Sequence, residues 1–94
     1  MVLNKNGKNL KMKVLKFQAS WCGPCKGLSM VIKGAEDKIK IPFEEVDIDN
    51  NVFMSANFNI RSVPTLVMVD SEEKEIKRIT GMLQEKELLE WLAS

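Results

Sequence analysis

Apolar residues are spaced in two ways along the chain, and each spacing predicts a different kind of element. Short runs rich in β-branched and aromatic residues are typical of strands. Four such runs lie at residues 13–19, 43–48, 65–69 and 75–80. Because the residues between the last two runs are polar, we expect a turn at 70–74 and an antiparallel hairpin.

Apolar residues three and four positions apart predict helices in the intervening segments. The first covers about residues 23–38, with Pro24 in its first turn, where the missing N–H does no harm. Further helices are predicted over residues 83–92 and, capped by Asn50 or Asn51, up to Phe58. The first helix and its flanking strands make a βαβ unit, which predicts parallel strands and a right-handed crossover.

The order of these elements from residue 13 onward is βαβαββα, which indicates an α/β fold. We expect a central mixed sheet of about four strands flanked by helices, in a single domain covering residues 1–94. Residues 1–12 leave room for one short strand or for a hairpin turning at Asn6-Gly7, but not for a strand and a full helix.

Composition supports a small soluble globular domain, since 45% of the residues are apolar and 29% are charged. The apolar runs are far shorter than the roughly 20 residues that span a bilayer. The first residues lack the apolar core of a secretory signal, so we expect a reducing cytoplasm. We expect neither a membrane nor a nucleic acid as a partner.

Charge is unevenly distributed although the net charge is only +1. Every charged residue among residues 1–35 is a lysine, and all 13 acidic residues lie at or after Glu36. Two interpretations are open. The lysines form a solvated edge that resists pairing with other sheets, or they face an acidic partner.

The two cysteines of the chain lie in the sequence Trp-Cys-Gly-Pro-Cys-Lys at residues 21–26, where a predicted strand ends and a helix begins. Cys22 therefore lies at a helix N-terminus, where unpaired N–H groups, the helix dipole and Lys26 favour its thiolate. Cys25 is one turn further on and faces the domain. We expect it to be shielded and to react only after a mixed disulfide forms on Cys22.

Gly23 and Pro24 make a tight turn that keeps the two sulfurs within bonding distance. A zinc site needs four ligands, and this chain has two cysteines and no histidine, so carboxylates or a second chain would have to complete it. A purely stabilising disulfide gains little from so short a loop. Two inert buried thiols are a further alternative, but a helix N-terminus is a poor place for them, so thiol redox chemistry is favoured.

The sequence resembles the thioredoxin family from about Val14 to the C-terminus. The resemblance is carried by residues 21–26 after an apolar strand, Asp47-Ile48-Asp49, Ile60-Arg61-Ser62-Val63-Pro64-Thr65 and Gly81 before the last helix. It implies a thioredoxin fold with Cys22 as the attacking thiolate, Cys25 as the resolving thiol, and Pro64 as a cis-proline facing the disulfide. Gly-Pro between the cysteines is similar to the reductases of the family.

The resemblance further implies a monomeric protein disulfide reductase without an organic cofactor, recharged by a thioredoxin reductase or a similar donor. Its protein substrates would dock on Trp21, on Gly23-Pro24, on the Val63-Pro64 edge and on the loop at Gly81-Met82. Two alternatives remain. One is a glutaredoxin-like reductase driven by glutathione, and the other is a binding subunit of a larger enzyme that uses the same face without redox turnover.

Three features depart from the family pattern. The initial strand and helix are lacking, which predicts a short or absent first strand at one sheet edge. Gln18 stands where the family often has a second Trp. Lys16 and Glu45 stand where the family has a buried Asp and its Lys partner, so the two charges are exchanged. We expect a buried Lys16–Glu45 pair that helps to deprotonate Cys25; alternatively, Lys16 extends to solvent near the sheet edge.

Overall fold

A computed structural model describes residues 2–3 and 9–94. Its main sheet has four strands in the order β4-β3-β5-β6, and these are β3 (Lys13–Gln18), β4 (Phe43–Asp47), β5 (Thr65–Val69) and β6 (Glu75–Thr80). β3 pairs with β4 in parallel, whereas β3–β5 and β5–β6 are antiparallel. The predicted α/β fold and mixed sheet are thereby confirmed, and each strand matches its predicted range to within one residue.

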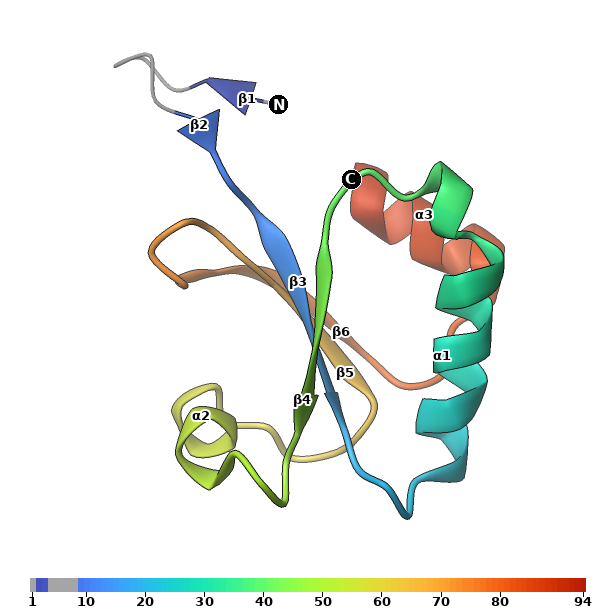
Figure 1. The fold of residues 1–94 in the computed structure, drawn as a ribbon, viewed down its shortest axis with the longest axis vertical. Coiled ribbons are helices and arrows are strands. Elements are labelled where there is room, and N and C mark those ends of the chain that lie inside the picture. The colour runs from blue at the N-terminus through green and yellow to red at the C-terminus, as the bar shows by residue number, and fades with distance from the viewer. Residues whose placement is uncertain (1, 4–8) are drawn as a thin grey trace.

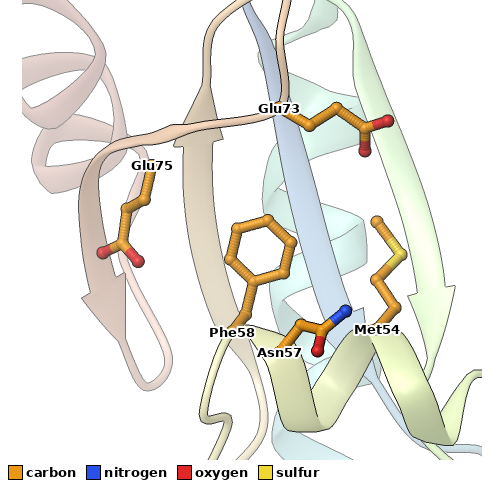
Figure 2. Close-up of a pocket in the computed structure, with 5 residues that line it drawn as sticks. All are labelled: Met54, Asn57, Phe58, Glu73 and Glu75. Carbon is orange, nitrogen blue, oxygen red and sulfur yellow. The ribbon is translucent and has the colours of Figure 1, made fainter.

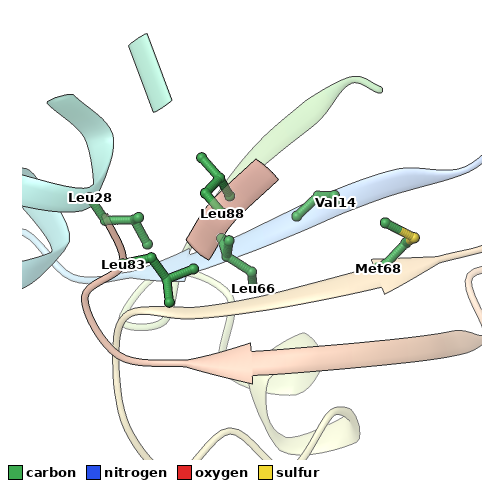
Figure 3. Packing of buried hydrophobic residues seen from close by; sticks show 6 residues of the cluster. All are labelled: Val14, Leu28, Leu66, Met68, Leu83 and Leu88. Carbon is green, nitrogen blue, oxygen red and sulfur yellow. The ribbon is translucent and has the colours of Figure 1, made fainter. Parts of the chain in front are cut away.

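Helices cover both faces of the sheet (Figure 1). α1 (Gly23–Gly34) and α3 (Glu85–Ala93) pack on one face, and the short α2 (Val52–Asn57) packs on the other. The core of the α1/α3 face contains the buried residues Val14, Leu28, Leu66, Met68, Leu83 and Leu88 (Figure 3). The core of the α2 face contains Leu15, Phe17, Val46, Val67 and Val69.

α1 is shorter than the predicted helix over residues 23–38. It ends at Gly34, and a separate 3₁₀ turn, η1 (Glu36–Lys38), follows. Glycine is a poor helix former, and after it the backbone tightens. The N–H of Ala35 donates to the carbonyl of Ile32 at 3.2 Å, and the N–H of Lys38 to that of Ala35 at 2.8 Å. Ala35 is fully buried, so the tightened turn stays packed on the domain.

α3 begins two residues later than the first residue of the predicted helix, Leu83. Gln84 is its N-cap, and its N–H donates to the Glu87 carboxylate at 3.0 Å. Leu83 precedes the cap and Leu88 lies four residues inside the helix; both are buried in the same core. This is the arrangement of a hydrophobic staple, which fixes the entry of the chain into a helix. Leu83 is therefore a core residue of the preceding loop rather than a helical one.

The chain before β3 forms a second, two-stranded sheet. β1 (Val2–Leu3) pairs antiparallel with β2 (Asn9–Leu10), whereas Asn6-Gly7, where the hairpin was predicted to turn, lies outside the described residues. In the described part of the chain, β4 is an edge strand of the main sheet, as the lack of an initial strand predicted. No helix of the described residues has the length and apolar character that crossing a membrane requires.

Candidate functional site: a dithiol at the start of α1

Cys22 and Cys25 form a disulfide at the N-terminus of α1. The turn after β3 brings the N–H of Cys22 to the carbonyl of Ala19 at 3.1 Å, and Cys22 becomes the N-cap residue of the helix. The backbone N–H of Cys25 donates to Sγ of Cys22 at 3.1 Å. A helix N–H that points at this sulfur stabilises negative charge on it, so Cys22 is the better placed of the two to hold a thiolate.

Exposure separates the two cysteines less than the sequence suggested. In this disulfide form Cys22 is 5% exposed and Cys25 is 2% exposed, so both side chains are buried. They pack with Ala19 in a small cluster, against which Ile48 and Val63 also pack. We expected Cys25 to be shielded and Cys22 to be the more accessible thiol. In the disulfide form this difference is small, because both cysteines are buried in the same cluster.

The loop before β5 lies against the disulfide. The Val63–Pro64 peptide bond is cis, as the family resemblance implied, and the carbonyl of Val63 lies 3.8 Å from Sγ of Cys22. The carbonyl of Pro64 accepts a hydrogen bond from the N–H of Gly81 at 2.8 Å, which ties the loop after β6 to this segment. Pro64 is itself buried, so the accessible part of this edge is the half-buried Val63.

Two exposed apolar side chains belong to the loops around the disulfide. Trp21 is 68% exposed, and its Nε1 donates to the Asp49 carboxylate at 3.1 Å. Met82 is 42% exposed, and its sulfur lies so near Gly27 that a Cβ added there would meet it at 3.3 Å. Gly81, with φ +100°, adopts a backbone conformation that other residues rarely adopt. Gly23 and Pro24, between the cysteines, are exposed.

Lys16 is buried, with 2% of its surface exposed, so the alternative in which it extends to solvent is wrong. Its Nζ donates to Oε1 of Gln18 on the same strand. Glu45 is its register partner on β4 but is exposed, and no Lys16–Glu45 ion pair occurs among the described residues. Burial lowers the pKa of Lys16, and this effect outweighs the Glu45 carboxylate, which acts in the opposite direction. The expected fully buried pair is therefore not present.

A cleft of about 220 Å³ opens beside Cys25. Its lining comes from β3, α1, β4 and the loop after β3, and it consists of Gln18, Ala19, Ser20, Cys25, Lys26, Ser29, Glu45 and Asp47. Cys25 lines this cleft and Cys22 does not. The cleft thus gives the inner thiol, and not the outer one, a route to water and to the carboxylates of β4.

A wider depression of about 510 Å³ lies between α2 and the segment before β6 (Figure 2). Met54, Asn57, Phe58, Glu73 and Glu75 line it, and no cysteine is among them. The Glu75 carboxylate already binds Arg78, whose Nε lies 2.7 Å from Oε2. This depression is therefore separate from the dithiol site.

Two contacts of the site were not predicted from the sequence. One is the hydrogen bond between Trp21 and Asp49, and the other is the contact of Lys16 with Gln18. The second had a signal in the sequence, because residues two apart on a strand lie on the same face. Gln18 had been considered only as the residue in place of a Trp.

The chain matches the family model described as Thioredoxin over residues 3–94. It is 40% identical over 80 residues to thioredoxin C-3 of Corynebacterium nephridii, covering 84% of this chain and 54%, or about half, of that protein. It is 34% identical over 104 residues to a thioredoxin of Rickettsia prowazekii, covering 98% and 96% of the two chains. The solved structure of Fasciola hepatica thioredoxin matches with a TM-score of 0.76 at 30% identity, over 88% of this chain and 79% of that one.

Proposed function

The chain belongs to the thioredoxin family, and we propose that it is a thiol–disulfide oxidoreductase that reduces disulfides in proteins. The observation that carries the proposal is the disulfide between Cys22 and Cys25 at the N-terminus of α1, with the N–H of Cys25 donated to Sγ of Cys22. This hydrogen bond favours Cys22 as the nucleophile once the pair is reduced.

The reaction proceeds in two exchanges. The Cys22 thiolate attacks one sulfur of a substrate disulfide, so a Cys22–substrate disulfide forms and the other substrate sulfur leaves as a thiolate, which takes a proton. Cys25 then loses its proton and attacks Sγ of Cys22. The Cys22–Cys25 disulfide forms, the bond to the substrate breaks, and the second substrate thiol is released. The substrate gains two electrons and the protein loses two.

Glu45 is the proposed acceptor of the Cys25 proton, directly or through water, because both residues line the same cleft. Lys16 would favour the Cys25 thiolate by its charge. The substrate would dock over the disulfide between Trp21 and Met82, which are both exposed, with extended backbone placed beside Val63. A separate reductase must return two electrons to the protein after each turnover.

The deciding experiment is reduction of insulin disulfides by the full chain with two electron donors in turn, a thioredoxin reductase with NADPH and reduced glutathione. We expect turnover with the first donor, whereas turnover with glutathione alone would indicate a glutaredoxin-like reductase. The variant with Cys22→Ser and Cys25→Ser should be inactive. If insulin is reduced equally well without the wild-type chain, the proposal is wrong.

The order of attack can be measured separately. Brief treatment of the reduced protein with iodoacetamide should label Cys22 before Cys25, because the helix N–H groups favour its thiolate. The Cys25→Ser variant should accumulate mixed disulfides with substrates. Label on Cys25 first would reverse the assignment of the two roles.

We further propose that the protein works as a monomer in the cytoplasm, where donor systems keep such dithiols reduced. Size-exclusion chromatography of the reduced protein tests the monomer. Acid trapping of thiols in growing cells tests the compartment, because a reductase in a reducing compartment is expected to be found mainly as the dithiol.

A further inference from the structure

The interior next to the dithiol contains an ammonium group without a buried carboxylate beside it. β3 places Val14, Lys16 and Gln18 on the α1/α3 face of the sheet, since alternate residues of a strand share a face. Lys16 lies between its register partners on the neighbouring strands, which are the exposed Glu45 and the fully buried Leu66. Among the described residues, the group that accepts a hydrogen bond from Lys16 is the side-chain amide of Gln18.

This contact fixes which way the Gln18 amide faces. An ammonium group has three donors and no acceptor, whereas a side-chain amide has one oxygen acceptor and one NH₂ donor. Only the oxygen of Gln18 can therefore face Lys16, and Oε1 is the atom in contact. The NH₂ group is left for the other side, and within the described part of the chain it has no protein acceptor. Gln18 is half-buried and lines the cleft beside Cys25.

In the second exchange a negative charge develops on the Cys25 sulfur beside this cleft, because Cys25 must become a thiolate before it attacks Cys22. The charged side chains that line it are Lys26 from α1 and Glu45 and Asp47 from β4, and Lys16 lies behind Gln18. The two carboxylates disfavour a thiolate beside them. A donor aimed into the cleft acts against this effect, and a hydrogen bond to a charged group is among the stronger ones in proteins.

We propose that Gln18 takes part in the second exchange by donating a hydrogen bond from its Nε2 to the Cys25 thiolate in this cleft, and that Lys16 is a positioning residue that holds the amide in this orientation. The inference rests on the proposed redox function. It assigns a role to a residue that sequence comparison marked only as a departure from the family pattern. The site then uses an ammonium and an amide in place of a buried carboxylate.

The test measures Cys25 directly. In a Cys22→Ser background Cys25 is the single thiol of the chain, so its thiolate fraction follows from the rate of iodoacetamide alkylation between pH 5 and pH 10. Gln18→Met keeps the size of the side chain and removes the donor. We expect it to reduce the thiolate fraction at neutral pH about tenfold, since one hydrogen bond to a charged group supplies an effect of that order. Gln18→Glu should reduce it further, because a carboxylate repels the thiolate.

The positioning role of Lys16 is tested by a cycle. Lys16→Met should lower the thiolate fraction more in the presence of Gln18 than after Gln18→Met, where only the effect of the Lys16 charge remains. If the two effects are additive, Lys16 acts by its charge alone and the positioning role is wrong. If neither Gln18→Met nor Gln18→Glu shifts the alkylation profile, the donor role is wrong.

Gln84→Met is the matched control. It makes the same chemical change at the N-cap of α3, away from the cleft lining, so it reports what lost stability alone does to the alkylation profile. We expect no shift from it. A shift equal to that of Gln18→Met would also overturn the proposal. The profile is measured without any substrate, so failure of insulin reduction by the wild-type chain would reject the proposed function and leave this result to be judged by itself.

Discussion

The two faces of the sheet are built from the same strands but differ in what they bury. On the α2 face, β3 contributes Leu15 and Phe17, both fully buried and apolar. On the α1/α3 face the same strand contributes Val14, then Lys16 and then Gln18, so the apolar residue is followed by polar ones toward the end next to the dithiol. Figure 1 shows that α1, which contains Cys25 and has Cys22 as its N-cap, covers this second face.

Within β3, the residues of one face therefore serve mainly stability, and those of the other face lie next to the site of the proposed chemistry. An apolar core gains free energy from every buried carbon, whereas a buried ammonium costs free energy unless its partners are well placed. The α2 face has an apolar core, and its polar contacts lie at its rim. The α1/α3 face contains a buried ammonium next to the cleft where a thiolate must form. The predictions below test this contrast, from the largest expected effect to the smallest.

Phe17→Ala should lower the free energy of unfolding by about 3–5 kcal/mol, as is typical when a buried aromatic ring is removed. Phe17 is fully buried, and its ring packs against that of Phe58 with centroids 5.6 Å apart. Urea unfolding followed by circular dichroism measures the loss. The control is Phe53→Ala on α2, where the ring is 88% exposed and the change should stay within about 0.5 kcal/mol. Equal effects of the two variants would contradict the assignment of the α2-face core.

Lys16→Met should raise the free energy of unfolding at neutral pH by about 1–2 kcal/mol, since replacing a buried charge by an apolar side chain of similar size is often stabilising. The stability of the wild type should also depend on pH in this range. Because burial lowers the pKa of Lys16, the unfolded chain binds more protons between that lowered pKa and 10.5, so wild-type stability gains from rising pH in this window.

The variant should lack that gain, so its advantage should shrink as the pH rises toward 10.5, the ordinary pKa of lysine. Urea unfolding of both proteins from pH 7 to pH 10 measures it. A variant that is less stable than the wild type at pH 7 would show that the α1/α3 face depends on its ammonium for stability, which would remove the contrast between the faces.

Arg78→Met should lower the free energy of unfolding by about 1 kcal/mol, mainly through loss of a hydrogen bond. The Arg78 guanidinium donates to the carbonyl of Phe58 at 2.7 Å and to the Glu75 carboxylate, so it joins β6 to the end of α2. Lys74→Met removes the same charge from an exposed pair with Glu72 and should leave stability nearly unchanged. If both variants behave alike, the polar rim of the α2 face contributes nothing specific.

Lys16 and Glu45 should be coupled by only about 0.5 kcal/mol in a double-mutant cycle of Lys16→Met and Glu45→Gln on stability. The two residues are register partners, but Glu45 is exposed and water screens its carboxylate. Unfolding of the four proteins at low salt gives the coupling. A value above about 2 kcal/mol would mean that the pair is buried in solution, as the sequence had suggested.

Much of the fold followed from local patterns. The ranges of the four strands in the main sheet were predicted to within one residue, because short runs rich in β-branched and aromatic residues between polar turns favour strands. Helix ends were predicted less well: α1 stops at Gly34, and α3 starts at Glu85 because Leu83 packs into the core ahead of the cap. Apolar spacing shows which residues face the core, but a residue of a loop can face the core as well.

In the candidate site, too, local sequence predicted some features and not others. The placement of Cys22 and Cys25 at the start of a helix required only the strand before them and Pro24 between them. The contacts of Trp21 with Asp49 and of Pro64 with Gly81 join residues 28 and 17 positions apart, and no local pattern specifies such pairs. The cis Val63–Pro64 bond came from the family resemblance, since few X–Pro bonds are cis and the residues alone do not mark this one.

The sequence by itself determined the chemistry and the order of elements: two thiols two residues apart, at the junction of a buried strand and a helix, in a βαβαββα chain. Only the tertiary structure decided the surroundings of the second thiol. Register placed Glu45 beside Lys16, but β4 is an edge strand in the described chain, so the carboxylate lies in water and the ammonium contacts Gln18 instead. The register of paired strands follows from their hydrophobic pattern, whereas the burial of a side chain depends on what else covers it, and that is a property of the whole fold.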